Sequence, residues 1–205
     1  ANVPDLRLVG SFGGYADLRH VIAYVTTGVH AFAGRRYIER QEEYNRWKLF
    51  ALLVGLVEDE RDRGLLQTIA DRKLANPSAD TGSLEVALGD QGRSILALIT
   101  NRREEAVGPL LARLPPRARE SLDRLSPISV VPRLSGRLLI AHGAADTSIP
   151  FTESLRLAEA SQGRARAIIF QTFQHTGPQP LWESLRERAR DGWQLFRLAD
   201  ALLAP

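Results

Sequence analysis

Residues 137–150 read Arg-Leu-Leu-Ile-Ala-His-Gly-Ala-Ala-Asp-Thr-Ser-Ile-Pro, and this stretch decides the fold class. It begins with an almost continuous apolar run, which is typical of a strand buried on both faces of a parallel sheet. Residues 165–170, Ala-Arg-Ala-Ile-Ile-Phe, form a second run of this kind. Helical spacing of apolar residues covers 154–160 between the two runs and 181–203 after them. This alternation of strand and helix predicts a parallel α/β unit over residues 126–205.

A third strand is predicted near the start of the chain. Residues 6–9 and 11–15 have a strand pattern that runs into a glycine turn. Apolar residues then recur with helical spacing over residues 16–25. We therefore expect about three parallel strands in all, with residues 1–34 forming the first strand and helix of the same core.

The segment from 35 to 125 has a different character. Helical patterns cover 36–58, 65–74, 91–101, 104–114 and 115–125, and no strand pattern is visible among them. A helical block of this length between two strand regions is typical of an inserted cap. The sequence thus predicts an α/β protein with a large all-helical cap at residues 35–125, between core parts at 1–34 and 126–205.

Composition and charge exclude several classes of protein. The net charge is +3, but the arginines are scattered among acids, as in residues 58–63, Glu-Asp-Glu-Arg-Asp-Arg. We interpret such charges as solvated helix faces, because a nucleic-acid site needs clustered basic residues. No apolar run reaches the ~20 residues that span a bilayer. The absence of cysteine excludes disulfides, thiolate zinc sites and cysteine nucleophiles.

No metal site is expected, because the four histidines and the acids show no ligand spacing. No cofactor is expected either. No signal peptide is visible at the start, so we expect a cytoplasmic location and leave secretion open. Arginine greatly outnumbers lysine in this chain, which indicates a GC-rich bacterial gene.

Two polar residues follow the two predicted C-terminal strands. Asp146 comes shortly after the strand that begins at residue 137, and His175 follows the strand at 165–170. In an open α/β sheet, ligands bind beyond the carboxyl ends of the strands, where both residues are expected to lie. A carboxylate there can accept the Nδ1–H bond of an imidazole and leave Nε2 free to take a proton from a nucleophile.

A strand followed by His-Gly-x-x-Asp-x-x-Ile-Pro, then a helix, a strand and a histidine loop, resembles the end of the α/β-hydrolase family. Residues 9–28, from Val-Gly-Ser-Phe-Gly-Gly to Thr-Thr-Gly, are similar to the strand after the nucleophile elbow in bacterial members that carry a helical cap. The resemblance covers roughly residues 1–30 and 126–205. It implies that Asp146 is the acid and His175 the base of a catalytic triad.

Alternative roles stay open for the polar residues. Asp146 would also suit a turn that it caps before the next helix, and His175 would also suit an exposed loop. His142, at a strand end, is interpreted as structural, with its ring bonded to nearby backbone. His20 and His30 lie on a predicted helix and at its exit, and the sequence indicates no partner for either.

The nucleophile does not follow the family pattern, because the chain contains no Gly-x-Ser-x-Gly. Ser11 is the nearest candidate, but Val9 stands where the tight elbow needs a small residue. The favoured alternative is that the nucleophile and oxyanion hole belong to an N-terminal hydrolase half outside this sequence. The first strand would then be a bare edge that pairs with that half, on a separate chain or one cleaved off, or with a second copy of this chain.

The function implied by the resemblance is a serine hydrolase, acting on a carboxylic ester with a hydrophobic acyl or alcohol group. A relative with a non-serine nucleophile is one alternative. A catalytically inactive hydrolase-like module for binding or assembly is another.

Overall fold

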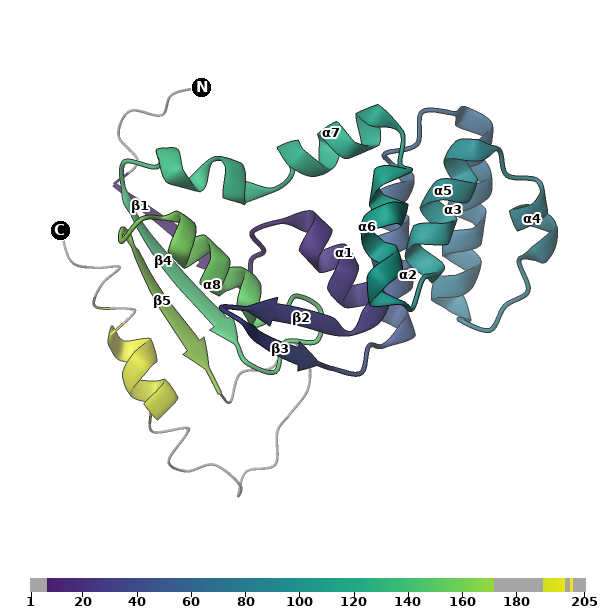
Figure 1. Cartoon of the computed structure of the whole chain (residues 1–205). Coiled ribbons are helices and arrows are strands. Elements are labelled where there is room, and N and C mark those ends of the chain that lie inside the picture. Colours follow the sequence, from purple (N-terminus) through teal and green to yellow (C-terminus); the bar gives the residue numbers. More distant parts are fainter. Residues whose placement is uncertain (1–6, 172–189, 198–199, 201–205) are drawn as a thin grey trace, which may run out of the picture. The chain divides into compact units, whose positions relative to one another are not determined.

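The structure is a computed structural model that describes residues 7–171, 190–197 and 200. The chain divides into two compact units by packing. The sheet unit comprises residues 1–17, 32–34 and 126–205, and the helical unit comprises 18–31 and 35–125. The strands and helices of the two units are labelled in Figure 1.

The sheet unit is built on three parallel strands in the order β1-β4-β5. Its elements are β1 (Leu8–Phe12), the 3₁₀ turns η1 (Pro127–Ser129) and η2 (Val131–Arg133), β4 (Arg137–Gly143), α8 (Phe151–Ala160) and β5 (Ala165–Phe170). Residues 190–197 are also helical. The central strand β4 pairs Ile140 with Ser11 on one side and with Ala167 on the other. Three parallel strands match the number that the sequence predicts.

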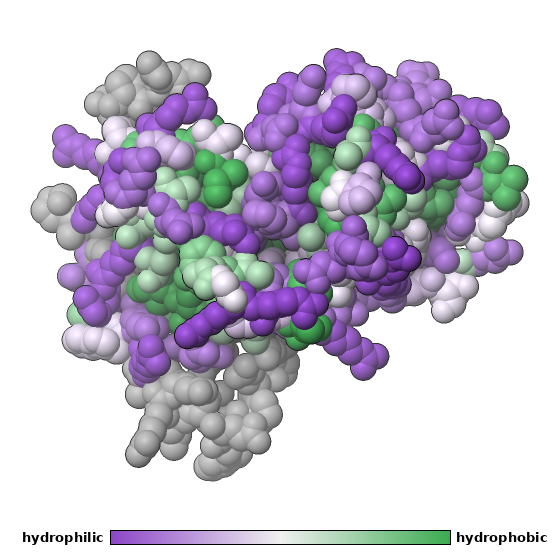
Figure 2. Space-filling view, in the orientation of Figure 1, coloured by the Kyte–Doolittle hydropathy of each residue, from purple (hydrophilic) through white to green (hydrophobic). Residues whose placement is uncertain are grey.

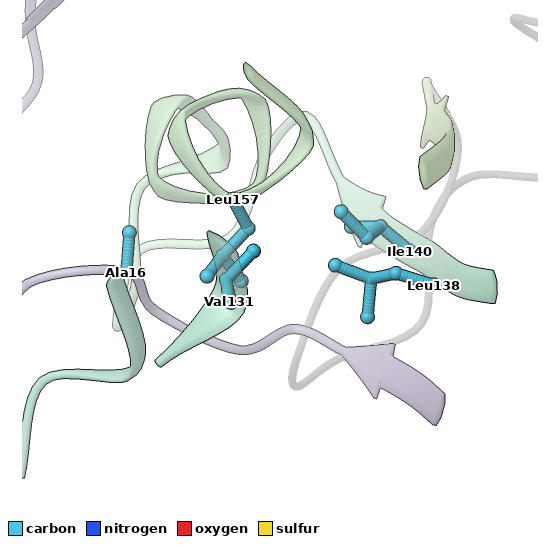
Figure 3. Packing of buried hydrophobic residues seen from close by; sticks show 5 residues of the cluster. All are labelled: Ala16, Val131, Leu138, Ile140 and Leu157. Atoms are coloured by element: carbon cyan, nitrogen blue, oxygen red, sulfur yellow. The ribbon is translucent and has the colours of Figure 1, made fainter. Parts of the chain in front are cut away.

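One face of this sheet packs against α8 and the turns before β4. Leu138 and Ile140 point from β4 toward Leu157 of α8, as Figure 3 shows. Ile140 is fully buried, and burial of such a side chain contributes about 1.5–3 kcal/mol to folding. The buried cluster consists of Ala16, Val131, Leu138, Ile140 and Leu157. Because side chains alternate along a strand, His142 of β4 also points to this face.

The opposite face carries a smaller buried cluster of Leu139, Ala141 and Ile168. On β1 this face is more open, and Phe12 is 62% exposed. Within the described residues, β1 is an edge strand that pairs only with β4. The sequence prediction that β1 pairs with a further strand stays a prediction.

The helical unit contains most of the helices. Its elements are α1 (Leu18–Thr27), β2 (Val29–Phe32), β3 (Arg35–Ile38), α2 (Glu43–Val54), α3 (Glu60–Ala75), α4 (Gly82–Val86), α5 (Asp90–Thr100), α6 (Glu104–Ala112) and α7 (Pro116–Arg124). Residues 32–34, at the turn between β2 and β3, are grouped with the sheet unit. Figure 2 shows hydrophilic residues over much of the visible surface, with an apolar patch over α4, where Val86 is 85% exposed.

The hairpin of β2 and β3 corrects one prediction. The sequence predicted a helix from residue 36 and no strand within 35–125, whereas Arg35–Ile38 is a strand. The two strands are joined by Ala33 and Gly34, which have φ values of +48° and +77°. A two-residue loop with both φ values positive matches the twist of a hairpin. Alanine at the first position is not a hairpin signal, which explains the error.

Two buried charged side chains fix the helices of this unit. Arg46 donates to the carbonyl oxygens of Thr26 (2.9 Å) and Asn101 (3.0 Å) and to that of Ile99 (2.5 Å). These carbonyls lie at the ends of α1 and α5, where a cation complements the helix dipole. Burial lowers the pKa of Arg46 to about 10.

Asp62 lies at the start of α3 and is only 2% exposed. Its carboxylate accepts from the N–H groups of Gly89 (2.6 Å) and Gly92 (2.7 Å), which begin α5. The interpretation of residues 58–63 as a solvated face is therefore wrong for Asp62. A carboxylate at the first turn of a neighbouring helix satisfies donors that have no partner within that helix.

The fold class is mixed α/β, as the sequence predicts. A three-stranded parallel sheet with many helices is compatible with an α/β-hydrolase and is shared by other α/β proteins. The domain limits at 34 and 125 stay a prediction; by packing, α1 belongs with the helical unit. In the described part of the chain, no helix combines the length and apolarity needed to cross a membrane.

Candidate functional site

The loop between β4 and α8 holds the candidate site. It starts at Gly143, the last residue of β4, and ends at Pro150, which precedes α8. The Ala144 N–H donates to the carbonyl oxygen of Phe170 (2.7 Å), so this loop is tied to the carboxyl end of β5. The loop therefore lies where an open parallel sheet binds its ligands.

Asp146 is 3% exposed and is held by its own turn. Its Oδ1 accepts from the N–H groups of Ser148 (2.8 Å) and Ile149 (3.1 Å), and its own N–H donates to the carbonyl oxygen of Gly143 (3.2 Å). This is the turn-capping geometry that aspartate favours, and it was the structural alternative for this residue. The same bonds fix the carboxylate through one oxygen.

The second oxygen of Asp146, Oδ2, lies 3.6 Å from Nε2 of His142. The His142 ring is fully buried and is held at both nitrogens. Nδ1 lies 2.6 Å from the Ser154 hydroxyl, and Nε2 lies 3.0 Å from the carbonyl oxygen of Ile149. The prediction that His142 is bonded to nearby backbone is confirmed, whereas its contacts with Ser154 and Asp146 were not predicted.

Ser154, His142 and Asp146 have the residue types of a catalytic triad but not its geometry. In a triad the aspartate bonds Nδ1 and the serine bonds Nε2, whereas here the serine lies at Nδ1 and the aspartate near Nε2. Ser154 lies in α8 and is completely buried, out of reach of a substrate. These three side chains therefore do not form a catalytic triad with one another.

Ser11 lies inside β1, where it pairs with Ile140. Its Oγ occupies the space beside Gly14, because a Cβ added at Gly14 would lie 2.5 Å from it. A nucleophile elbow places its serine on a strained turn between a strand and a helix. The position within a strand favours the alternative in which the nucleophile lies on another segment.

His175 lies outside the described residues, as do most residues of the helix predicted at 181–203. Its predicted contact with Asp146 therefore stays a prediction. The strand that precedes it, β5, is the parallel neighbour of β4.

Sequence reasoning missed two further polar residues of the sheet unit. Glu153, 1% exposed in α8, accepts from the N–H groups of Ala16 (3.0 Å) and Asp17 (2.8 Å) and so fixes the segment that leaves β1. Tyr15 lies in that segment, and burial raises the pKa of its phenol. The position of Tyr15 near the end of a predicted strand could have pointed to this residue, whereas no sequence pattern marks Glu153.

A polar cluster in the helical unit was also missed. The Tyr24 hydroxyl donates to Glu39 Oε2 (2.5 Å), and His30 Nε2 lies 3.3 Å from Oε1 of the same carboxylate. The His30 ring stacks on Tyr37 with centroids 4.9 Å apart. The hydrogen bond from His30 and then that from Tyr24 lower the pKa of Glu39 against the opposing effect of burial. The hairpin of β2 and β3 brings these partners together. Because the sequence predicted a helix from residue 36, it did not predict this cluster.

Within the described ranges, no group of three or more histidine, aspartate or glutamate residues is arranged to hold a metal ion. The arrangement after β4 instead presents an anchored carboxylate at the carboxyl end of a parallel sheet. Such a group can orient and charge-stabilise an imidazole. No protein-family model matches the chain, and no curated protein is similar enough to it to count as a match.

Proposed function

We propose that this chain carries the acid, Asp146, and the base, His175, of a serine hydrolase that cleaves carboxylic esters. The observation that carries the proposal is the buried Asp146 carboxylate, anchored through Oδ1 at the carboxyl end of the central strand. In such an enzyme the aspartate holds the imidazole tautomer and stabilises the imidazolium. The imidazole takes the proton of the nucleophile and later gives it to the leaving alkoxide.

The chain length after β5 is sufficient for this pair to meet. Phe170 ends β5, and its carbonyl oxygen bonds Ala144 in the same loop as Asp146. His175 follows Phe170 by five residues, a span of at most about 18 Å when fully extended. A loop of this length can return its histidine to the carboxylate.

The nucleophile is proposed to lie on a further strand that pairs with the open edge of β1. The bonds from Arg137 N–H to the Arg7 carbonyl (2.9 Å) and from Gly13 N–H to the Ala141 carbonyl (2.8 Å) set the ladder between β1 and β4. In a parallel ladder alternate residues bond to opposite sides, so the peptide groups of Leu8, Gly10 and Phe12 face the open edge. This edge, with the exposed Phe12 beside it, fits a strand of an N-terminal hydrolase half or of a second copy.

The substrate class is proposed from the family resemblance alone. A hydrolase of this kind with a large helical cap would favour an ester with a hydrophobic acyl or alcohol group. Ester turnover by the complete assembly, measured with acyl chains of increasing length, tests this part independently of the triad.

Labelling with a fluorophosphonate probe, read by intact mass spectrometry under denaturing conditions, tests the proposal. Label on a co-purifying polypeptide of roughly 15–20 kDa supports a split hydrolase. Label on this chain alone supports Ser11 as the nucleophile. His175→Ala should remove the label in either case. A preparation that takes no label and hydrolyses no ester would contradict the proposal and favour a non-serine nucleophile or a binding module.

A further inference from the structure

We propose that His142 is a positioning residue for Asp146, and that its Nε2–H holds residues 146–149 in the turn that presents the Asp146 carboxylate. The catalytic value of this positioning rests on the proposed function. The positioning itself is a property of this chain and is tested without any assay of activity.

Ile149 connects the imidazole to the carboxylate. Its N–H donates to Asp146 Oδ1 (3.1 Å), and its carbonyl oxygen lies 3.0 Å from His142 Nε2. The same Nε2 lies 3.6 Å from Asp146 Oδ2. The ring of His142 therefore touches both sides of the turn, the peptide of Ile149 and the carboxylate that this peptide anchors.

The partners of the ring decide where its proton lies. A carbonyl oxygen only accepts hydrogen bonds, so Nε2 must carry a proton to bond with Ile149. A proton at Nε2 also attracts the neighbouring Oδ2, whereas a lone pair there would repel it. The Ser154 hydroxyl can donate to Nδ1 or accept from it, so this assignment of Nε2 holds in both charge states of the ring.

Ser154 supplies the second point of attachment. Its hydroxyl lies 2.6 Å from Nδ1 and is carried by α8, which packs on the same face of the sheet. A ring bonded at both nitrogens and fully buried has little freedom to rotate. The position of the Asp146 turn is thereby linked to α8, in addition to the bonds within the turn.

Two conservative substitutions separate the two attachments. In His142→Gln the side-chain amide can place a donor near the position of Nε2, which keeps the bond to Ile149 and loses the contact with Ser154. In His142→Asn the shorter amide reaches the position of Nδ1, which keeps the contact with Ser154 and loses the bond to Ile149. Both variants remove the ring, so they serve as matched controls for packing.

The experiment measures amide hydrogen exchange of Ser148 and Ile149 by NMR in the 205-residue chain. His142→Asn is expected to speed exchange at both amides by about tenfold or more relative to His142→Gln, because the turn opens more often. The amide of Ile140, in the middle of β4, serves as the internal control and should exchange at the same rate in both variants.

Equal exchange at Ile149 in the two variants, or an equal rise throughout β4, would show a packing role only and would overturn the proposal. A second measurement needs no variant and covers the case in which the variants do not fold. Long-range correlations to the ¹⁵N nuclei of the wild-type ring should show a proton on Nε2, and an unprotonated Nε2 would also overturn the proposal. Failure of fluorophosphonate labelling would contradict the proposed function. The amide-exchange result and the ring-proton result would still test the positioning role of His142.

Discussion

Each unit buries an aspartate whose carboxylate accepts two backbone N–H bonds, yet the two carboxylates are used differently. Asp62 in the helical unit divides its oxygens, with Oδ1 bonded to Gly89 and Oδ2 to Gly92. Asp146 in the sheet unit receives both N–H bonds on Oδ1, from Ser148 and Ile149. Its Oδ2 faces an imidazole at 3.6 Å.

This difference separates a carboxylate that joins two helices from one suited to act on another side chain. In Asp62 both oxygens are committed to the start of α5. In Asp146 one oxygen accepts the backbone bonds of its own turn, and the other lies beside the buried ring of His142. The separation along the sequence between each aspartate and its donors also differs. It is 27 and 30 residues for Asp62, and two and three residues for Asp146.

The largest expected effect is on catalysis, through Asp146→Asn. In the preparation that takes the fluorophosphonate label, this change should lower the rate of ester turnover by about 10³- to 10⁴-fold, because an amide no longer stabilises the imidazolium. Asp62→Asn in the same preparation should leave kcat within about threefold. Similar kcat losses in the two variants would contradict a catalytic role that belongs to Asp146 and not to Asp62.

The next effect is on stability, through Asp62. Asp62→Ala should lower the free energy of unfolding by about 2–4 kcal/mol, because it leaves two buried N–H groups without acceptors. Urea unfolding followed by far-UV circular dichroism measures this loss. A loss below about 1 kcal/mol would mean that water replaces the carboxylate, and that Asp62 does not join α3 to α5.

Glycine substitutions sharpen the account of Asp62. A Cβ at Gly92 would lie 2.9 Å from the Asp62 Cγ and 2.7 Å from Leu88 Cδ2, so Gly92→Ala should cost about 1–3 kcal/mol of stability. Gly64, within α3, has nothing within 4 Å of its added Cβ. Gly64→Ala is the matched control and should stabilise the chain by about 0.4–1 kcal/mol. Thermal unfolding of both variants checks the opposite signs.

The smallest effect concerns Glu39, whose carboxylate accepts hydrogen bonds from the side chains of Tyr24 and His30. Because the bonds from His30 and Tyr24 lower its pKa below the ordinary 4.5 in the folded state, its contribution to stability is present above that value. The contribution is lost as the pH falls through the lowered pKa. Unfolding midpoints of the wild type and Glu39→Gln should therefore converge on acidification below pH 4.5. Midpoints that stay the same distance apart down to pH 2 would contradict this account.

The parallel sheet was predictable because its strands are marked locally. The apolar runs at 137–141 and 165–170 are long enough to indicate buried strands, and the glycine turn marks the end of β1. The hairpin was not predictable in this way. Its turn uses Ala33 at φ +48°, and the exposed arginines Arg35 and Arg36 fit a helix as well as a strand.

The candidate site was predictable only in part. The His-Gly-x-x-Asp motif predicted that Asp146 follows a strand end and, as an alternative role, that Asp146 caps a turn. The contact between His142 and Ser154 depends on how α8 packs on the sheet, which no local pattern encodes. Asp62 was misread because its bonds reach Gly89 and Gly92 in a later helix. The partnership with His175 stays a prediction.

The distance between Asp146 Oδ2 and His175 Nδ1, measured in a crystal structure of this chain with its β1 edge occupied, tests the central claim most directly. The account predicts a separation of about 3 Å, with the Nδ1–H donating to the carboxylate. An ordered histidine more than about 6 Å away would contradict the assignment of these two residues as acid and base.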